Sequence, residues 1–278
     1  MGSSQLLVVD SDPAVHNHLS KILAREGRTI QDAYDGREAL EHLRSKACDL
    51  VLAGQGRNGL GDVKLLRRLR AVRPDTKVIV TGDPNKEQVL GAIKHRAYSY
   101  FHKPLPGAPL AEMVQQALES SSWKDDIRVY SARPEWITLD VRCKLEAADR
   151  TTHFMKELET DLPQQARDDV AGAFRELLMN AIEHGGKHDP RKRVRVSIVR
   201  TARALVVHIH DPGKGFSLDF LPHAAISNPE DAPIRHAEVR AEAGKRPGGF
   251  GILMTRNLVD ELMYNERGNA VLFVKYLR

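Results

Sequence analysis

The sequence predicts an α/β protein of two domains. The first is a doubly wound sheet of five parallel strands, and the second is a mixed sheet covered on one face by helices. The chain has 278 residues, enough for two ordinary domains, and 41% of them are hydrophobic, as in globular proteins. Short apolar runs alternate with amphipathic helical patterns over residues 1–120, which is typical of a parallel sheet. A serine-rich break then precedes a second alternation of strands and helices.

In the N-terminal domain, short apolar runs indicate strands and 3.6-residue periodicities indicate helices. Strands are expected at 5–9, 29–33, 49–53, 77–81 and 98–101. Helices are expected at 13–26, 36–46, 60–72, 85–95 and 108–119. Ligands of such sheets bind at the carboxyl ends of the strands.

The C-terminal domain is predicted at 136–278, after a linker at 121–135 whose later part already has a strand pattern at 126–131. Further strands are expected at 136–143, 194–199, 204–211 and 271–276, and helices at 146–159, 163–184 and 252–261. The segment 216–247 has no clean periodicity and contains four prolines. A loop of that length in a compact domain indicates a functional lid or a disordered segment.

Composition narrows the functional class. Cys48 and Cys143 are the only cysteines, which suits a reducing cytosol. No apolar run reaches the roughly 18 residues of a membrane span, and the N-terminus has no signal-peptide pattern, so we expect a cytoplasmic protein. The net charge of +5 comes from interleaved basic and acidic residues, which disfavours nucleic-acid binding. The basic cluster at 187–195 indicates a solvated turn or, alternatively, a surface for an acidic partner.

Acidic, hydroxyl and lysine residues follow three of the predicted strands. Asp10 and Asp12 follow the first, Thr81 closes the fourth, and Lys103 follows the fifth and precedes Pro104. Over roughly residues 4–120 these spacings resemble the receiver domains of two-component response regulators. The resemblance implies a cis bond before the proline.

The phosphoacceptor aspartate of that family falls on Gly54, which has no side chain to accept a phosphoryl group or to bind magnesium. Ser11 also replaces one of the acidic pair. We therefore expect a pseudo-receiver that keeps the fold and has lost phosphotransfer. Residues 54–59 also spell GxGxxG, but the motif follows the third strand and lacks the acidic residue about 20 positions on that a dinucleotide site needs.

The C-terminal domain contains a polar row on one helix and two glycine-rich turns. Glu176, Asn180 and His184 recur every fourth residue, so they are expected on one side of the helix at 163–184. The turns that follow are Asp211-Pro-Gly213-Lys-Gly215 and Gly248-Gly249-Phe-Gly251. In this order the segments resemble the N box, DxGxG box and second glycine box of the GHKL ATP-binding family. Within it they resemble the anti-sigma-factor serine kinases of bacterial partner-switching systems.

This resemblance covers about residues 136–278 and implies an α/β-sandwich (Bergerat) fold that uses ATP and Mg²⁺. Asp211 would accept a hydrogen bond from the adenine amino group. The glycines would let the backbone approach the nucleotide and lead into a helix N-terminus that favours phosphate. These glycines are Gly213, Gly215, Gly249 and Gly251. Alternatively, Asp211 is a cap and the glycines are ordinary turn residues.

Asn180 would bind magnesium through its side-chain oxygen, and Glu176 would accept the proton of an attacking Ser or Thr hydroxyl. The alternatives are a helix Asn bonded to a loop and an ordinary surface Glu. His184 could face a phosphate or cap the helix C-terminus. Lys245 and Arg246, in the expected lid, could meet the γ-phosphate.

These roles predict a serine/threonine kinase acting on an anti-sigma-factor antagonist, with a sigma factor as an alternative partner and a homodimer as a further expectation. The competing hypothesis is a nucleotide-responsive binding module without kinase activity. A histidine kinase is disfavoured, because His153 lies on a helix that is expected to belong to the ATP-binding domain. His208 and His210 share a strand face, but no third ligand accompanies them to make a metal site.

Overall fold

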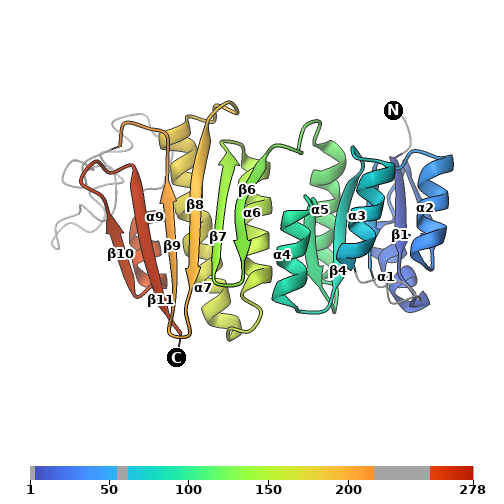
Figure 1. The fold of residues 1–278 in the computed structure, drawn as a ribbon, viewed down its shortest axis with the longest axis horizontal. Helices are drawn as coiled ribbons and strands as arrows, with labels where there is room; N and C mark the ends of the chain where they lie inside the picture. Colours follow the sequence, from blue (N-terminus) through green and yellow to red (C-terminus); the bar gives the residue numbers. More distant parts are fainter. Residues whose placement is uncertain (1–3, 55–61, 216–250, 278) are drawn as a thin grey trace. The chain divides into compact units, whose positions relative to one another are not determined.

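A computed structural model of the chain describes residues 4–54, 62–215 and 251–277 (Figure 1). The chain divides into two compact units, and each contains one β-sheet. The first unit comprises residues 1–124 together with 153–160, and the second comprises residues 125–152 and 161–278.

The first unit confirms the doubly wound five-stranded sheet. Its strands lie in the order β2-β1-β3-β4-β5, and every pairing is parallel. Because helices cover both faces of such a sheet, its strands are apolar runs, and Leu6, Leu50 and Ile79 are fully buried. The strands are β1 (Ser4–Val9), β2 (Arg28–Ala33), β3 (Leu50–Ala53), β4 (Lys77–Gly82) and β5 (Ser99–His102).

The helices of this unit begin where side chains can cap them. Asp12, Asp35 and Asn85 each accept hydrogen bonds from backbone amides in the first turn of the helix that follows. The helices are α1 (Pro13–Leu23), α2 (Gly36–Ser45), α3 (Asp62–Val72), α4 (Lys86–Lys94) and α5 (Gly107–Glu119). Helix α1 contacts α5, while α3 contacts both α2 and α4, so the two groups form the layers on either side of the sheet.

The second unit contains a six-stranded sheet in the order β10-β11-β9-β8-β7-β6. Its strands are β6 (Ile127–Arg133), β7 (Trp136–Arg142), β8 (Arg193–Arg200), β9 (Ala204–His210), β10 (Glu261–Tyr264) and β11 (Ala270–Tyr276). All pairings between these strands are antiparallel, so the prediction of a mixed sheet was wrong. The reason is that β6–β7, β8–β9 and β10–β11 are hairpins, which join antiparallel neighbours. Strand β6 also lies within 121–135, the stretch predicted as a linker, because it pairs with β7.

Helices pack on one face of this sheet (Figure 1). They are the part of α6 (Leu145–Leu158) that precedes residue 153, α7 (Gln164–Asn180), the π-helix η1 (Ala181–Gly186) and α9 (Gly251–Leu258). The strands present a buried row to them, in which Ile137, Ile198, Val207 and Phe273 stand opposite one another across four strands. The alternate residues of each strand point to the other face.

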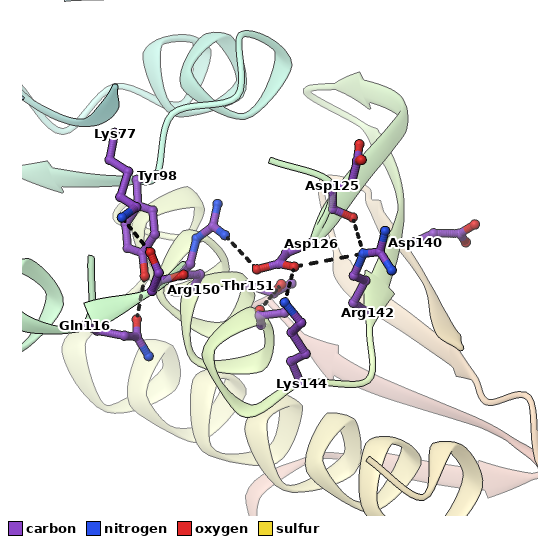
Figure 2. A network of polar contacts seen from close by, with 12 residues as sticks. Lys77, Tyr98, Gln116, Asp125, Asp126, Asp140, Arg142, Lys144, Arg150 and Thr151 are labelled. Carbon is purple, nitrogen blue, oxygen red and sulfur yellow. Dashed lines mark hydrogen bonds and ion pairs between the residues drawn. The ribbon is translucent and has the colours of Figure 1, made fainter. Parts of the chain in front are cut away.

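A buried carboxylate supports the start of this unit. Figure 2 shows the Asp126 side chain between Arg142, Lys144 and Arg150. Its oxygens lie 3.2 Å from Nζ of Lys144 and 3.5 Å from Nη1 of Arg150. Asp126 and Arg150 are both almost fully buried, so each compensates the charge of the other where water cannot. This cluster holds the chain just before β6.

None of the described helices is both long and apolar enough to cross a lipid bilayer. Cys48 and Cys143 are buried free thiols. Burial raises the pKa of Cys143 to about 11, which keeps this thiol protonated and unreactive near neutral pH.

Candidate functional site

Glu176 and Asn180 meet on one side of helix α7, as their spacing predicts. Nδ2 of Asn180 donates a hydrogen bond of 3.3 Å to Oε1 of Glu176, and both side chains are half-buried. Leu177 and Leu178, on the opposite stripe, are buried in the core of the unit and fix the orientation of the helix. The amide orientation directs Oδ1 of Asn180 away from Glu176, and this oxygen has no hydrogen bond within the described part of the chain.

His184 lies beyond the end of α7, in the element that follows. The α-helix ends at Asn180 and the next six residues form the π-helix η1, whose wider turn changes the angle between successive side chains. His184 is exposed, and its charge is one of the smaller influences on the carboxyl group of Asp211. Lys187 and His188 then adopt positive φ angles of 59° and 52°, which end the helix. A π-turn followed by left-handed residues is common at functional sites.

Asp211 stands at the end of β9, directly against the end of η1. A Cβ atom at Gly185 would overlap the Asp211 carboxylate, so only glycine permits this approach. Oδ1 of Asp211 accepts a hydrogen bond of 2.7 Å from the amide of Gly213, and Oδ2 has no hydrogen bond among the described residues. Burial raises the pKa of the Asp211 carboxyl group, while the Gly213 amide and His210 act in the opposite direction. The carboxylate therefore offers one open acceptor in a partly desolvated position.

Two asparagines of the β10–β11 hairpin, which were not predicted from the sequence, support Asp211. The backbone amide of Asp211 donates to the carbonyl of Asn269, and the buried Asn269 side chain accepts from Nδ2 of Asn265 at 2.9 Å. Gly215 has a φ of 83°, and a Cβ there would overlap the carbonyl of Arg267 in the same hairpin. The sequence signal that could have located this support is the Asn-x-x-Gly-Asn turn itself.

Helix α9 begins against Glu176. A Cβ at Gly251 would overlap the Glu176 carboxylate, which therefore lies at the first turn of α9. Oγ1 of the fully buried Thr255 donates 2.9 Å to the carbonyl of Gly251 and fixes this turn. Burial, together with the nearby Glu176 carboxylate, raises the pKa of the Tyr264 phenol. Neither Thr255 nor Tyr264 was predicted from the sequence.

The described part of the site fits a nucleotide with a magnesium ion. Asp211 has an acceptor available for an amino group, and the glycines around it leave backbone exposed where a Cβ would intrude. The N-terminal amides of α9 favour an anion. Oδ1 of Asn180 is the kind of oxygen ligand that magnesium takes together with phosphates and water.

Some predicted contacts cannot be placed. Lys245, Arg246 and Gly249 lie outside the described residues. His208 and His210 lie on one face of β9, and no group of three His, Cys, Asp or Glu side chains in the described ranges could hold a metal ion. Nε2 of His210 instead lies 3.2 Å from Nδ2 of Asn269.

In the first unit, Asp10, Gly54, Thr81 and Lys103 converge at the carboxyl ends of β1, β3, β4 and β5. Nζ of Lys103 lies 2.8 Å from Oδ2 of the buried Asp10. A Cβ at Gly54 would overlap that same carboxylate and would lie 2.9 Å from Oγ1 of Thr81. The Asp10 side chain thus fills the space that a side chain at position 54 would need.

The Asp12 carboxylate has a different role from these four residues, because it caps a helix. Its carboxylate accepts 2.8 Å from the amide of Ala14 and caps α1, while its own amide donates to Oδ1 of Asp10. The Lys103–Pro104 bond is cis, as the receiver resemblance implied. The GxGxxG run beyond Gly54 lies outside the described residues.

A Gly54→Ala variant is expected to lose about 1–3 kcal/mol of unfolding free energy, because the added methyl group must displace the Asp10 carboxylate from Lys103. Chemical denaturation of the full chain, followed by the fluorescence of Trp123 in the core of the first unit, measures this loss. Gly107→Ala is the matched control, since its Cβ would make only an ordinary contact of 3.6 Å with Ile22. If both variants lose the same unfolding free energy, the Asp10 carboxylate does not fill the space beside Gly54.

His153 is engaged within the first unit. Its Nε2 lies 2.7 Å from the carbonyl oxygen of Tyr100, and its ring lies 4.1 Å from that of Phe101. Residues 153–160 belong to this unit, whereas their whole helix was expected in the ATP-binding domain. Burial lowers the pKa of His153, although Glu157 acts in the opposite direction. A phosphorylatable histidine needs an accessible ring nitrogen, so this environment disfavours the histidine-kinase hypothesis.

Comparison with known families matches both halves of the chain. Residues 6–115 match the response regulator receiver domain, and residues 141–275 match the histidine kinase-like ATPase domain.

Two of the similar curated proteins are named as regulatory proteins. The transcriptional regulatory protein ZraR of Salmonella typhimurium is 30% identical over 118 residues, which are 42% of this chain and 27% of that protein. The nitrogen assimilation regulatory protein NtrX of Azorhizobium caulinodans is 27% identical over 126 residues, covering 44% of this chain and 28% of that protein. The chain thus spans little more than a quarter of the length of these relatives.

Among solved structures, the signal receiver domain of an HD domain-containing protein from Pseudomonas fluorescens is 30% identical. The match covers 42% of this chain and 94% of that one, with a TM-score of 0.40. The receiver domain of NtrX from Brucella abortus is 29% identical, covers 42% of this chain and 99% of that one, and has a TM-score of 0.38.

Proposed function

We propose that this chain, a receiver domain followed by a histidine kinase-like ATPase domain, is a cytoplasmic bacterial signalling regulator that phosphorylates a protein partner on Ser or Thr. The partner would be an anti-sigma-factor antagonist, as the resemblance of the three motifs implies, with a sigma factor as the alternative. The observation that supports this most is the position of Glu176, a carboxylate placed between Asn180 and the first turn of α9. A carboxylate there lies beside the amides that would receive phosphate.

In the proposed reaction, Asp211 accepts a hydrogen bond from the adenine amino group, and the amides at the start of α9 face the phosphates. Glu176 accepts the proton of the partner's hydroxyl group as that oxygen bonds to the γ-phosphorus and the bond to ADP breaks. Mg²⁺, held through Oδ1 of Asn180, would neutralise phosphate charge. Burial and the nearby Glu176 carboxylate raise the pKa of Tyr264, so its phenol stays protonated.

The experiment is transfer from γ-labelled ATP to a cognate antagonist, identified by pull-down from the source cell with and without ATP. We expect acid-stable label on a Ser or Thr of the antagonist. Label that stays on this chain, or no transfer at all, would contradict the kinase assignment.

One observation favours the second candidate, a nucleotide-responsive binding module. The Glu176 carboxylate already has a structural role, because a negative charge at the first turn of α9 stabilises that helix. A module of this kind would bind ATP without turnover, and its affinity for the partner would depend on the nucleotide. Calorimetric ATP binding without any product formation would support it over the kinase.

For the receiver domain we propose regulation by contact in place of phosphorylation. The Asp10–Lys103 ion pair and the absence of a side chain at Gly54 support this. Acetyl phosphate is expected to leave no acyl phosphate on the chain, as read by intact mass. A receiver that keeps its aspartate serves as the positive control. A stable acyl phosphate on residues 4–120 would show the proposal wrong.

A further inference from the structure

Exposed basic side chains of the first unit gather where helices α3 and α4 lie side by side. On α3, Lys64, Arg67 and Arg68 are exposed, and their i, i+3 and i+4 spacing places them along one stripe. The leucines of the same helix are buried on its other side. Lys94, in the last turn of α4, and Arg96, just after it, are exposed as well. We call these five residues the basic face.

The two parts of the basic face are neighbours because α3 and α4 pack closely. A Cβ atom at Gly91 of α4 would lie 2.8 Å from Cγ2 of Val63 of α3, so the glycine lets the two helices approach. Arg67 follows Val63 by about one turn, and His95 follows Gly91 by about one turn. The pKa of His95 is lowered first by burial and then by the positive charges of Arg67 and Lys94. These cations therefore lie near one another.

The charges of the basic face are not neutralised within the described part of the chain. No ion pair there includes any of its five members. Glu87 stands in the first turn of α4, roughly 10 Å along the helix from Lys94. Asp75, which follows α3, is paired with Lys124. Like charges at neighbouring positions repel one another, so this face favours an anionic partner.

Arg96 occupies a position where helices usually have glycine. Its φ is 57°, and the amides of Arg96 and Ala97 donate to the carbonyls of Ile93 and Ala92, which is the Schellman arrangement at a helix end. A residue with a side chain is strained in this conformation, whereas glycine is not. Lys94 already supplies the positive charge that favours the helix C-terminus. The fold does not require an arginine here, which points to a role outside the fold.

Arg70 of α3 fixes the turn that carries Arg96. Its Nη2 donates a hydrogen bond of 2.6 Å to the carbonyl oxygen of Arg96, and its Nη1 donates to the carbonyl oxygen of Thr76. The guanidinium group also lies 4.6 Å from the centroid of the Trp123 ring. The backbone at Arg96 is therefore held relative to α3, so a partner that binds here orders little of this chain.

We propose that the basic face is a docking site for an acidic segment of a protein partner, whose Asp and Glu side chains pair with the five cations. Each exposed ion pair contributes little by itself, so the partner must present several carboxylates. Such a contact forms rapidly and weakens with salt. It uses none of the residues of the candidate ATP site.

The size and composition of the basic face favour a protein over other polyanions. Four residues of α3 and one interhelical spacing give a face roughly 10 Å across, too small for the many phosphates that a duplex-binding protein contacts. A single strand needs aromatic side chains on which its bases stack, and a membrane surface needs apolar side chains that enter the headgroup layer. The large hydrophobic side chains that are exposed among the described residues all lie between positions 130 and 276, so the basic face offers neither.

Fluorescence anisotropy of the full chain with a labelled Glu-rich peptide tests the proposal. The probe is a helical peptide of about 15 residues with Glu at i, i+3 and i+4, and the same peptide with Gln in place of Glu is its control. The wild-type chain is expected to bind the Glu peptide and not the Gln peptide. The affinity should fall about tenfold when the salt concentration rises from about 50 to about 200 mM.

Charge reversal locates the binding. Lys94→Glu is expected to weaken binding of the Glu peptide by about fivefold or more, and the further change Arg67→Glu should abolish it. Lys21→Glu is the matched control and should leave binding unchanged. Lys21 is likewise an exposed lysine in the last turn of its helix, but that helix is α1, in the other helical layer of the unit. Circular dichroism verifies that each variant is folded.

Arg96→Gly separates binding from stability. The change removes one cation of the basic face and relieves the left-handed backbone, while the Schellman amides remain. Binding of the Glu peptide should weaken by about threefold, whereas the midpoint of thermal unfolding should stay the same or rise. A lower midpoint with unchanged binding would show that Arg96 serves the fold and would count against the proposal.

Other results would overturn the proposal as a whole. These are absence of binding to the Glu peptide, equal binding of the Gln peptide, or equal losses in Lys94→Glu and Lys21→Glu. Tighter binding of a DNA duplex, an RNA oligonucleotide or vesicles of phosphatidylserine and phosphatidylcholine, abolished by Lys94→Glu, would also overturn it. None of these measurements requires ATP or phosphoryl transfer, so their outcome is independent of the proposed kinase activity.

Discussion

Replacing Glu176 with Gln is expected to reduce phosphoryl transfer to the partner by about 10²- to 10⁴-fold, the usual contribution of a general base. Gln preserves the length of the side chain and its hydrogen bond with Asn180, but it cannot accept the proton of the attacking hydroxyl group. ATP binding is expected to change little, because the proposed hydrogen bond to adenine is made by Asp211. Single-turnover transfer from labelled ATP measures the rate, and calorimetry measures the binding.

The matched control for this variant is Glu183→Gln, which removes an exposed carboxylate from η1, one helical element further along the chain. It should leave transfer unchanged. If Glu176→Gln transfers phosphate as fast as the wild-type chain, Glu176 is a structural residue at the start of α9 and the binding-module hypothesis gains.

Replacing Asp211 with Asn is expected to weaken ATP binding by about 10²- to 10³-fold. The variant loses a charge-assisted hydrogen bond to the adenine amino group. It also buries the amide of the new Asn side chain against that amino group, and the two effects together cost about 3–4 kcal/mol. Asn retains the size of the side chain and its hydrogen bond from Gly213, so the Gly185 approach is preserved. Isothermal titration calorimetry measures the affinity, and GTP is the control ligand, because it has no amino group at the corresponding position.

The same residue sets a pH dependence. Because burial raises the pKa of Asp211, its carboxylate takes up a proton at a higher pH than an ordinary aspartate does. ATP affinity should therefore be at its maximum at neutral pH and should fall as the pH drops through this raised pKa. In Asp211→Asn, which cannot titrate, that part of the pH dependence should disappear.

Sequence alone predicted the first sheet well, because a strand buried on both faces must be a continuous apolar run. Such a strand needs no alternation of apolar and polar residues, and β1 and β3 follow directly from the runs Leu6–Val9 and Leu50–Ala53. The antiparallel sheet was harder to predict. Strand β6 is only partly buried, and its register with β7 shifts between Val129 and Ser131. It belongs to the sheet because it pairs with β7, and the sequence of β6 alone does not show this pairing.

The candidate site, too, was only partly predictable from the sequence. The contact between Glu176 and Asn180 follows from helical spacing, and the structure confirms it at 3.3 Å. The π-helix that carries His184 does not follow, because a change to π-helical hydrogen bonding leaves no mark in the apolar periodicity. Asp12 was expected beside Asp10, yet it caps α1, a role that the following proline already indicates. Thr255 and Tyr264 come from separate elements and meet the site only in three dimensions.

We propose that α7, the end of β9 and the start of α9 form one ATP site. Isothermal titration calorimetry of the full chain with ATP and magnesium tests it most directly. We expect one ATP to bind per chain, with binding retained in Glu176→Gln and lost in Asp211→Asn. Absence of binding in the wild-type chain, or binding that Asp211→Asn leaves unchanged, would contradict it.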